Sequence, residues 1–148
     1  MATEVYNGED RQVQIAVGPA MLVGTLSVPP DAHGVVLFAH GSGSSRLSPR
    51  NRSVAHFLRD SGLATLLMDL LTADEERVDV QTRQLRFNID LLAHRLVNAT
   101  DWLAHNADTR RLAIGYFGAS TGAGAALVAA AIGHPGGGAP PRRPGAAR

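Results

Sequence analysis

The stretch GYFGASTGAG, residues Gly115 to Gly124, decides the fold, because it joins an apolar strand to a helix through one tight bend. The apolar run at residues 111–117 is typical of a buried strand, and the alanine-rich segment after the bend favours a close-packed helix. Residues 118–122 fit the pattern G-x-S-x-G, in which the two outer glycines let neighbouring chain pass close by. The sequence therefore predicts a strand-to-helix turn that exposes the Ser120 hydroxyl at a helix N-terminus, where the helix dipole favours developing negative charge.

Four earlier segments are typical of strands. Residues 11–17 and 20–28 are rich in β-branched residues and are separated by Gly18-Pro19, which predicts an antiparallel hairpin. Residues 34–40 form a continuous apolar run, as expected of a central strand that is buried on both faces of a parallel sheet. Residues 63–70 predict another buried strand.

Helices are predicted between these strands. Residues 50–62 place apolar side chains on one helical face and end at Gly62. The apolar row from Leu85 to Leu103 predicts a helix that ends near Asn106, and we interpret the acidic run at residues 74–79 as a helix N-terminal cap region. Strands that alternate with helices predict an α/β fold, with a parallel sheet, right-handed crossovers and an N-terminal antiparallel hairpin.

Composition excludes several functional classes. The chain has 148 residues and 45% hydrophobic content, which suits one domain, and its net charge of +1 supports neither a nucleic acid nor a membrane surface as partner. Because there is no cysteine, disulfides, thiolate metal sites and cysteine nucleophiles are excluded. The N-terminus lacks the pattern of a signal peptide and no stretch is long enough to span a membrane, so we expect a cytoplasmic protein that acts on a small molecule.

An acyl-transfer serine needs two backbone N–H donors that point at the oxyanion. One donor usually comes from the residue after the nucleophile, which is Thr121 here. The second usually comes from a loop after an earlier central strand, and HGSGSSR (residues 40–46) stands in that place, with Ser42 as the best candidate. The sequence therefore predicts that two distant segments form one oxyanion hole.

Three segments together carry a family resemblance. FAHGSGSSRLSPRN (residues 38–51), LATLLMDLLTADEE (63–76) and GYFGASTGAGAALVAAA (115–131) resemble the dienelactone-hydrolase-like branch of the α/β-hydrolase superfamily, and the likeness covers roughly residues 10 to 132. The resemblance implies that Ser120 is the nucleophile and that Gly118 and Gly122 shape its turn.

The same resemblance assigns the oxyanion-hole amides to Ser42 and Thr121, with His40 and Gly41 shaping the first of these loops. One departure concerns the nucleophile itself. Dienelactone hydrolase proper uses a cysteine where this chain has Ser120, so the resemblance implies an esterase-like or related hydrolase and leaves the substrate open.

The partners of the serine are missing from the later sequence. In this family the chain order is nucleophile, acid, histidine, yet no Asp or Glu follows Ser120, and the only later histidine is His134. We therefore expect an impaired hydrolase; a catalytically dead truncated fragment and a noncatalytic binding module stay open as alternatives. Without the further strand-helix units of the family, residues 112–117 would form an apolar sheet edge that can self-associate.

The domain prediction follows from a change in composition at Gly133. Residues 1–132 form a partial α/β-hydrolase domain, and residues 133–148 form a tail of Gly, Pro, Arg, Ala and one His, in which no helix or strand is expected. Two interpretations stay open for this tail. It is either a disordered extension or the product of out-of-frame translation of GC-rich DNA.

Other sites have weaker signals. Arg46, with Arg50 and Arg52, could contact a substrate anion, although such a run is also typical of a solvated helix start. Glycines at 41 and 43 resemble a dinucleotide-binding turn, but arginine occupies the third glycine position, so no cofactor is expected. The histidines lack ligand spacing, so no metal is expected. We interpret Asp69, at a strand end, as packing or capping a loop.

Overall fold

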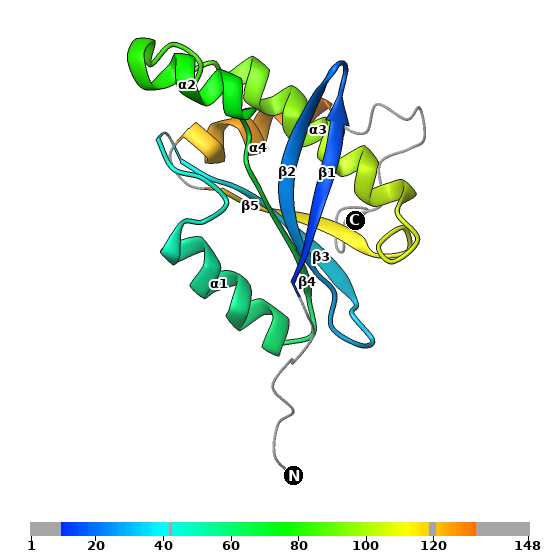
Figure 1. Ribbon diagram of the computed structural model, residues 1–148. Helices are drawn as coiled ribbons and strands as arrows, with labels where there is room; N and C mark the ends of the chain where they lie inside the picture. Colours follow the sequence, from blue (N-terminus) through cyan, green and yellow to red (C-terminus); the bar gives the residue numbers. More distant parts are fainter. Residues whose placement is uncertain (1–9, 42, 119–120, 133–148) are drawn as a thin grey trace.

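A five-stranded mixed sheet forms the frame of the protein, in a computed structural model that describes residues 10–41, 43–118 and 121–132 (Figure 1). The strand order is β1-β2-β4-β3-β5. The strands are β1 (Arg11–Val17), β2 (Ala20–Ser27), β3 (Gly34–Ala39), β4 (Ala64–Met68) and β5 (Ala113–Gly118). β1 pairs with β2 and β2 with β4 in antiparallel fashion, whereas β3 is parallel to both β4 and β5. The predicted α/β class, with an antiparallel start and a parallel core, is confirmed.

The hairpin between β1 and β2 turns at Gly18, whose φ of +62° lies in the left-handed region that glycine adopts without strain. Its register pairs Val17 with Ala20 across the turn. The hairpin therefore forms where Gly18-Pro19 predicted it.

Burial on both faces explains the continuous apolar runs of β3 and β4. Side chains alternate between the two faces of a sheet, so Val35 and Leu37 enter the larger core cluster while Phe38 enters a smaller cluster on the opposite face. β3 lies between β4 and β5. It is the central parallel strand that its sequence predicted.

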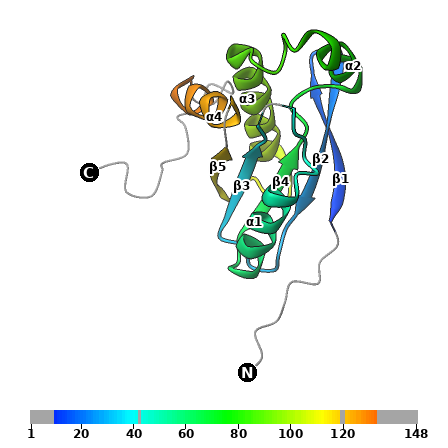
Figure 2. The same ribbon diagram turned by 90° about the vertical axis from the view of Figure 1, so that its left-hand side faces the viewer.

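Four helices flank the sheet in the described part of the chain. They are α1 (Pro49–Asp60), α2 (Ala73–Thr82), α3 (Ile89–His105) and α4 (Thr121–Ile132). α1 packs on the face that carries Phe38, and α3 and α4 pack on the opposite face (Figures 1 and 2). Ser48 caps α1 by accepting a hydrogen bond from the backbone N–H of Asn51, and Pro49 occupies the first helical position.

The segment between β4 and β5 corrects the sequence prediction, because it contains two helices where the apolar row and the acidic run suggested one. The acids do begin a helix: Thr72 and Glu75 form a capping box at the start of α2. That helix ends at Thr82 and is capped by Arg83, whose φ is +58°, and α3 begins only after its own cap, Asn88. Leu85, the first member of the predicted apolar row, lies in the break between the two helices.

The outer side of β5 is an edge of the sheet as far as the described residues extend. Every residue of β5 keeps some exposure, in contrast to the mostly buried β3. A groove of about 420 Å³ lies between β5 and α4, lined by Ile114, Tyr116, Ala126 and Leu127 among others, and Leu127 is 74% exposed. Among the described helices, none combines the length and the apolar character needed to cross a lipid bilayer.

Candidate active site

The ends of β3 and β5 lie side by side, because Ala39 pairs with Gly118 in the parallel register. Each strand ends at that pair, so the loop that begins at His40 starts beside the end of β5. Ser42, Ala119 and Ser120 lie outside the described residues. Thr121 is the first residue of α4. The register thus brings together the flanks of the two segments that the sequence assigned to one site.

The two glycines on either side of Ser120 are tightly packed. A Cβ atom on Gly122 would lie 2.2 Å from the carbonyl oxygen of Ala39 and 2.4 Å from that of His40. A Cβ atom on Gly118 would lie 2.8 Å from backbone atoms of Gly122 and Ala123. Because real Cβ contacts are longer than these, the turn between β5 and α4 admits only glycine at both positions.

His40 binds two backbone groups with its two ring nitrogens. Nε2 accepts a hydrogen bond from the backbone N–H of Leu70 at 3.0 Å, so the ring proton is on Nδ1, which donates to the carbonyl oxygen of Gly41 at 2.9 Å. The residue is 8% exposed. His40 therefore ties the loop after β3 to the chain after β4, and neither ring nitrogen is left to accept a proton from a nucleophile.

Asp69 holds the next part of this loop. Its carboxylate accepts hydrogen bonds from the backbone N–H of Arg46 at 2.8 Å and from the Arg46 guanidinium at 3.2 Å. The carboxylate therefore caps the loop, as its position after β4 suggested. Arg46, the candidate for a substrate anion, already has an anionic partner within the chain.

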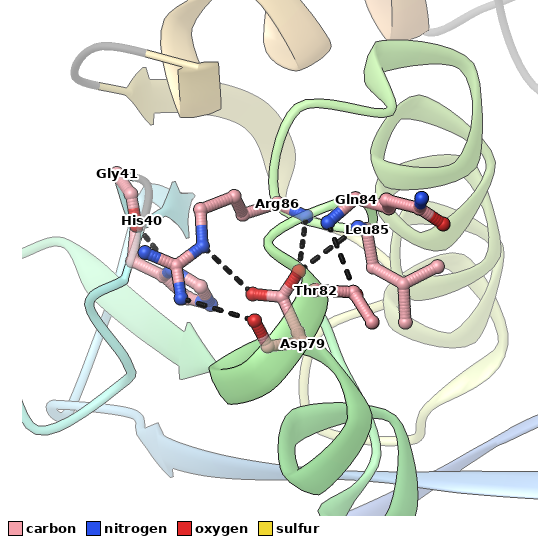
Figure 3. Close-up of polar contacts among 7 residues, drawn as sticks. All are labelled: His40, Gly41, Asp79, Thr82, Gln84, Leu85 and Arg86. Carbon is pink, nitrogen blue, oxygen red and sulfur yellow. Dashed lines mark hydrogen bonds and ion pairs between the residues drawn. The ribbon is translucent and has the colours of Figure 1, made fainter.

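An ion pair that the sequence reasoning missed supports the loop from the other side. Asp79 is 1% exposed; its carboxylate accepts hydrogen bonds from the backbone N–H groups of Leu85 and Arg86, and from the Arg86 guanidinium at 2.9 Å (Figure 3). The Arg86 side chain extends toward the segment at His40 and Gly41, and its Nη1 would lie 3.1 Å from a Cβ on Gly43. No spacing rule points to this pair, because it depends on the break between α2 and α3.

Two carboxylates near the site have lowered pKa values. Burial opposes the charged form of Asp79, but the hydrogen bonds and the charge of Arg86 outweigh burial and hold its pKa below the ordinary value. The side-chain hydrogen bond from Arg95 is the main cause that lowers the pKa of Glu75, and this guanidinium contacts both carboxylate oxygens at 2.8 and 2.7 Å. Both groups are paired anions in the folded protein.

A cavity of about 250 Å³ opens at this edge of the sheet. His40, Ser44, Ser45, Asp69 and Glu76 contribute polar groups to its lining, and Leu71 contributes an apolar wall. Within residues 10–41, 43–118 and 121–132, no group of three or more His, Cys, Asp or Glu residues is arranged to hold a metal ion. The described part of the site therefore offers a small polar cavity beside the loop that follows β3.

Known proteins with this architecture include several hydrolases. A dienelactone hydrolase from Anabaena variabilis superposes with a TM-score of 0.84 and 62% sequence identity, over 86% of this chain and 59% of that protein. An esterase from Pyrococcus furiosus superposes with a TM-score of 0.65 at 23% identity, over 82% of this chain and 46% of that one. A dienelactone-hydrolase-like phosphotriesterase from metagenomic libraries superposes with a TM-score of 0.67 at 18% identity, over 86% and 55% of the two chains.

Sequence comparison adds a second kind of relative. Two proteins from strains of Mycobacterium tuberculosis, each named as a phosphoribosyl transferase, are 58% identical over 122 residues, which is 82% of this chain and 27% of theirs. No protein-family model matches the chain. The chain thus spans about a quarter of these curated relatives and less than two thirds of the Anabaena hydrolase.

Proposed function

We propose that this chain, which has the dienelactone-hydrolase-like α/β-hydrolase fold, carries the nucleophile of a serine hydrolase that acts on an ester or related acyl bond. The observation that carries the proposal is the packing of Gly118 and Gly122, which bracket Ser120 and leave no room for a Cβ atom. Close packing of the two flanking glycines is what a nucleophile turn of this kind requires, and such a turn exposes the serine between a strand and a helix. In the reaction, Ser120 Oγ attacks the acyl carbon, the alcohol leaves, and water then releases the acyl group from the serine.

The oxyanion hole of this proposal consists of two backbone N–H groups, those of Thr121 and Ser42. Thr121 begins α4, where the free N–H groups of a helix N-terminus favour negative charge. The pairing of Ala39 with Gly118 supports the assignment of both donors to one oxyanion hole, because it brings the flanks of the two donor segments together. His40 and Gly41 shape the second segment through the ring hydrogen bonds described above.

We further propose that the serine of this chain works without an effective base. His40 has both ring nitrogens engaged, the sequence after Ser120 has no Asp or Glu, and its only later histidine is His134. A base must lie within hydrogen-bond reach of the proton that it abstracts. Loss of triad members costs several orders of magnitude in rate, so slow acylation is expected and turnover slower still.

The test is covalent labelling with a fluorophosphonate probe, in which the serine oxygen attacks phosphorus and fluoride leaves. Mass spectrometry of the digested protein is expected to find the adduct on Ser120, and Ser120→Ala is expected to remove it. Ser53→Ala is the matched control, because it deletes an exposed hydroxyl from α1, away from the proposed site, and should leave labelling intact. Added imidazole should raise the labelling rate of the parent chain by supplying the missing base.

The outcomes separate this proposal from its alternatives. A folded protein that is not labelled at Ser120, with or without imidazole, would identify the chain as a catalytically dead fragment or a noncatalytic binding module. Phosphoribosyl transfer, which the mycobacterial proteins have in their name, is not part of the proposal. The match covers only 27% of those proteins.

A further inference from the structure

A buried arginine on α3 lies outside the proposed catalytic turn. Arg95 is 8% exposed, and the residues one turn away on the same face of the helix, Leu92 and Ala99, are buried in the core. A charge in such surroundings is costly unless it is paired and hydrogen-bonded. The Glu75 carboxylate of α2 supplies the opposite charge through the two contacts described above. Arg95 also makes a third contact, which this ion pair does not require.

The third contact joins Arg95 to the chain that follows β4. Its Nη1 donates a hydrogen bond to the carbonyl oxygen of Leu70 at 3.2 Å, and Leu70 is fully buried. The backbone N–H of the same leucine donates to His40 Nε2, so hydrogen bonds hold the Leu70 main chain on both sides. The two backbone groups belong to neighbouring peptide units. Arg95 therefore acts on His40 by fixing where Leu70 lies.

Two consecutive residues after β4 hold the loop after β3 at its two ends. Leu70 binds His40, where the loop begins, and Asp69 binds Arg46 through its backbone N–H and its guanidinium. Asp69 is itself tied to β2, because its N–H donates to the carbonyl oxygen of Val23 at 2.9 Å. The contact with α3 gives Leu70 the corresponding anchor.

His40 transmits the position of Leu70 to the proposed oxyanion hole. Its Nδ1–H binds the carbonyl oxygen of Gly41, which also accepts a hydrogen bond from the N–H of Ser44 at 3.1 Å (Figure 3). Its own carbonyl oxygen lies against the first turn of α4, since a Cβ atom on Gly122 would be only 2.4 Å away. A shift of His40 would therefore move the loop after β3 relative to Thr121, whose N–H is one of the proposed donors.

We propose that Arg95 is a positioning residue of the oxyanion hole: it fixes Leu70, Leu70 fixes the place and the tautomer of His40, and His40 sets the loop against α4. An ion pair that only joined α2 to α3 would need Glu75 and no contact with Leu70. The inference rests on the proposed hydrolase function for its effect on rate, because oxyanion donors act only within hydrogen-bond distance. The dependence of His40 on Arg95 can be tested without any activity.

The first test reads the tautomer of His40 from its ring nitrogen shifts in a two-bond proton–nitrogen NMR spectrum of the full chain, with His40→Gln to assign the signal. At mildly alkaline pH the parent chain is expected to show the single Nδ1–H form. Arg95→Gln removes the guanidinium and should replace this signal with an average of the two tautomers. Arg95→Lys keeps the charge without the planar fork and should give an intermediate signal.

Leu103→Ala is the matched control for lost stability. It leaves a cavity under the same helix and does not touch the contacts that lead from Arg95 to His40. The signal of His40 should therefore stay in the Nδ1–H form in this variant. Circular dichroism shows whether each variant is folded, and Arg95→Lys serves for both tests if Arg95→Gln does not fold.

The second test is the rate of fluorophosphonate labelling at Ser120 in the presence of imidazole. Arg95→Gln should slow labelling by about tenfold or more, because displaced donors stabilise the transition state less well. Arg95→Lys should recover part of this loss, and Leu103→Ala should label at the parent rate.

An unchanged Nδ1–H signal in both Arg95 variants overturns the proposal, whatever the labelling rates are. Labelling that the Arg95 variants do not slow, or that Leu103→Ala slows equally, overturns it as well, because the contact with Leu70 would then have no effect of its own on the site. If the parent chain is not labelled at all, the hydrolase function fails, and the NMR spectra alone decide whether Arg95 holds His40.

Discussion

Two glycines in the first turns of α4 differ in what a side chain would meet. Gly122 lies against the end of β3, whereas a Cβ atom on Gly124 would make only an ordinary contact of 3.4 Å with Ile89. The G-x-S-x-G pattern predicts a small residue at Gly122. It cannot predict which atoms enforce that requirement, because the carbonyl oxygens of Ala39, at the end of β3, and of His40, just after it, lie about eighty positions earlier in the chain.

We therefore expect Gly122→Ala and Gly124→Ala to act in opposite directions. Gly122→Ala should lower the free energy of unfolding by about 3 kcal/mol or more, since the carbonyl oxygens in its way belong to backbone that cannot move aside. Gly124→Ala should leave it unchanged or raise it by up to about 1 kcal/mol through better helix propensity. Urea denaturation followed by circular dichroism measures both. Equal effects of the two variants would contradict the packing described for this turn.

At the scale of elements, the sequence predicted the strands, the antiparallel hairpin at the start and the parallel core. It did not predict the break between α2 and α3. The step from Leu85 to Ile89 fits a helix, so the periodicity gives no sign of an interruption. The interruption comes from Asp79, which binds the backbone N–H groups of Leu85 and Arg86 in place of helical partners. Such a tertiary competitor for backbone hydrogen bonds has no signature in local sequence.

The break makes stability depend on pH in acid. Because the folded pKa of Asp79 lies below its ordinary value of 3.8, the unfolded chain binds more protons in that range, and stability falls as the pH drops below about 4 toward the folded pKa. Asp79→Asn should lower stability at neutral pH and flatten this slope. Asp74→Asn, whose carboxylate is 85% exposed in the first turn of the same helix, is the control. Denaturation curves from pH 2 to 6 test the difference, and parallel slopes in all three proteins would refute the role given to Asp79.

At the scale of the whole molecule, the parallel core is asymmetric. β4 covers one side of β3 and β5 the other, but the outer side of β5 has no partner in the described part of the chain. Unpaired N–H and C=O groups on an apolar edge are a template for a second strand. The sequence predicted this edge at residues 112–117, and its use in self-association is a proposal that solution measurements can decide.

A charge on that edge should reduce self-association. Gly115 is exposed, and a side chain there would meet no atom within 4 Å, so Gly115→Lys adds a charge to the edge without a steric cost. Pairing of two such edges would bring like charges together, and we expect association to weaken by about tenfold. Sedimentation velocity over a range of concentrations measures it. Ala104→Lys, at an exposed position of α3, carries the same charge change and should have no effect; association that is insensitive to both would place the contact elsewhere.

The pairing of β3 with β5 also has a consequence for the order in which the protein is made. Gly34 pairs with Ala113, about eighty residues later, so β3 leaves the ribosome long before its partner on that side exists. At about 5–20 residues per second, roughly 4–16 s separate the synthesis of the two strands. During this interval the hairpin of β1 and β2 can form by itself, whereas β3 has no partner strand on the side where β5 later pairs. Among the described strands, β5 is therefore the last to be synthesised, and its pairing with β3 can form only after the other described strands have been made.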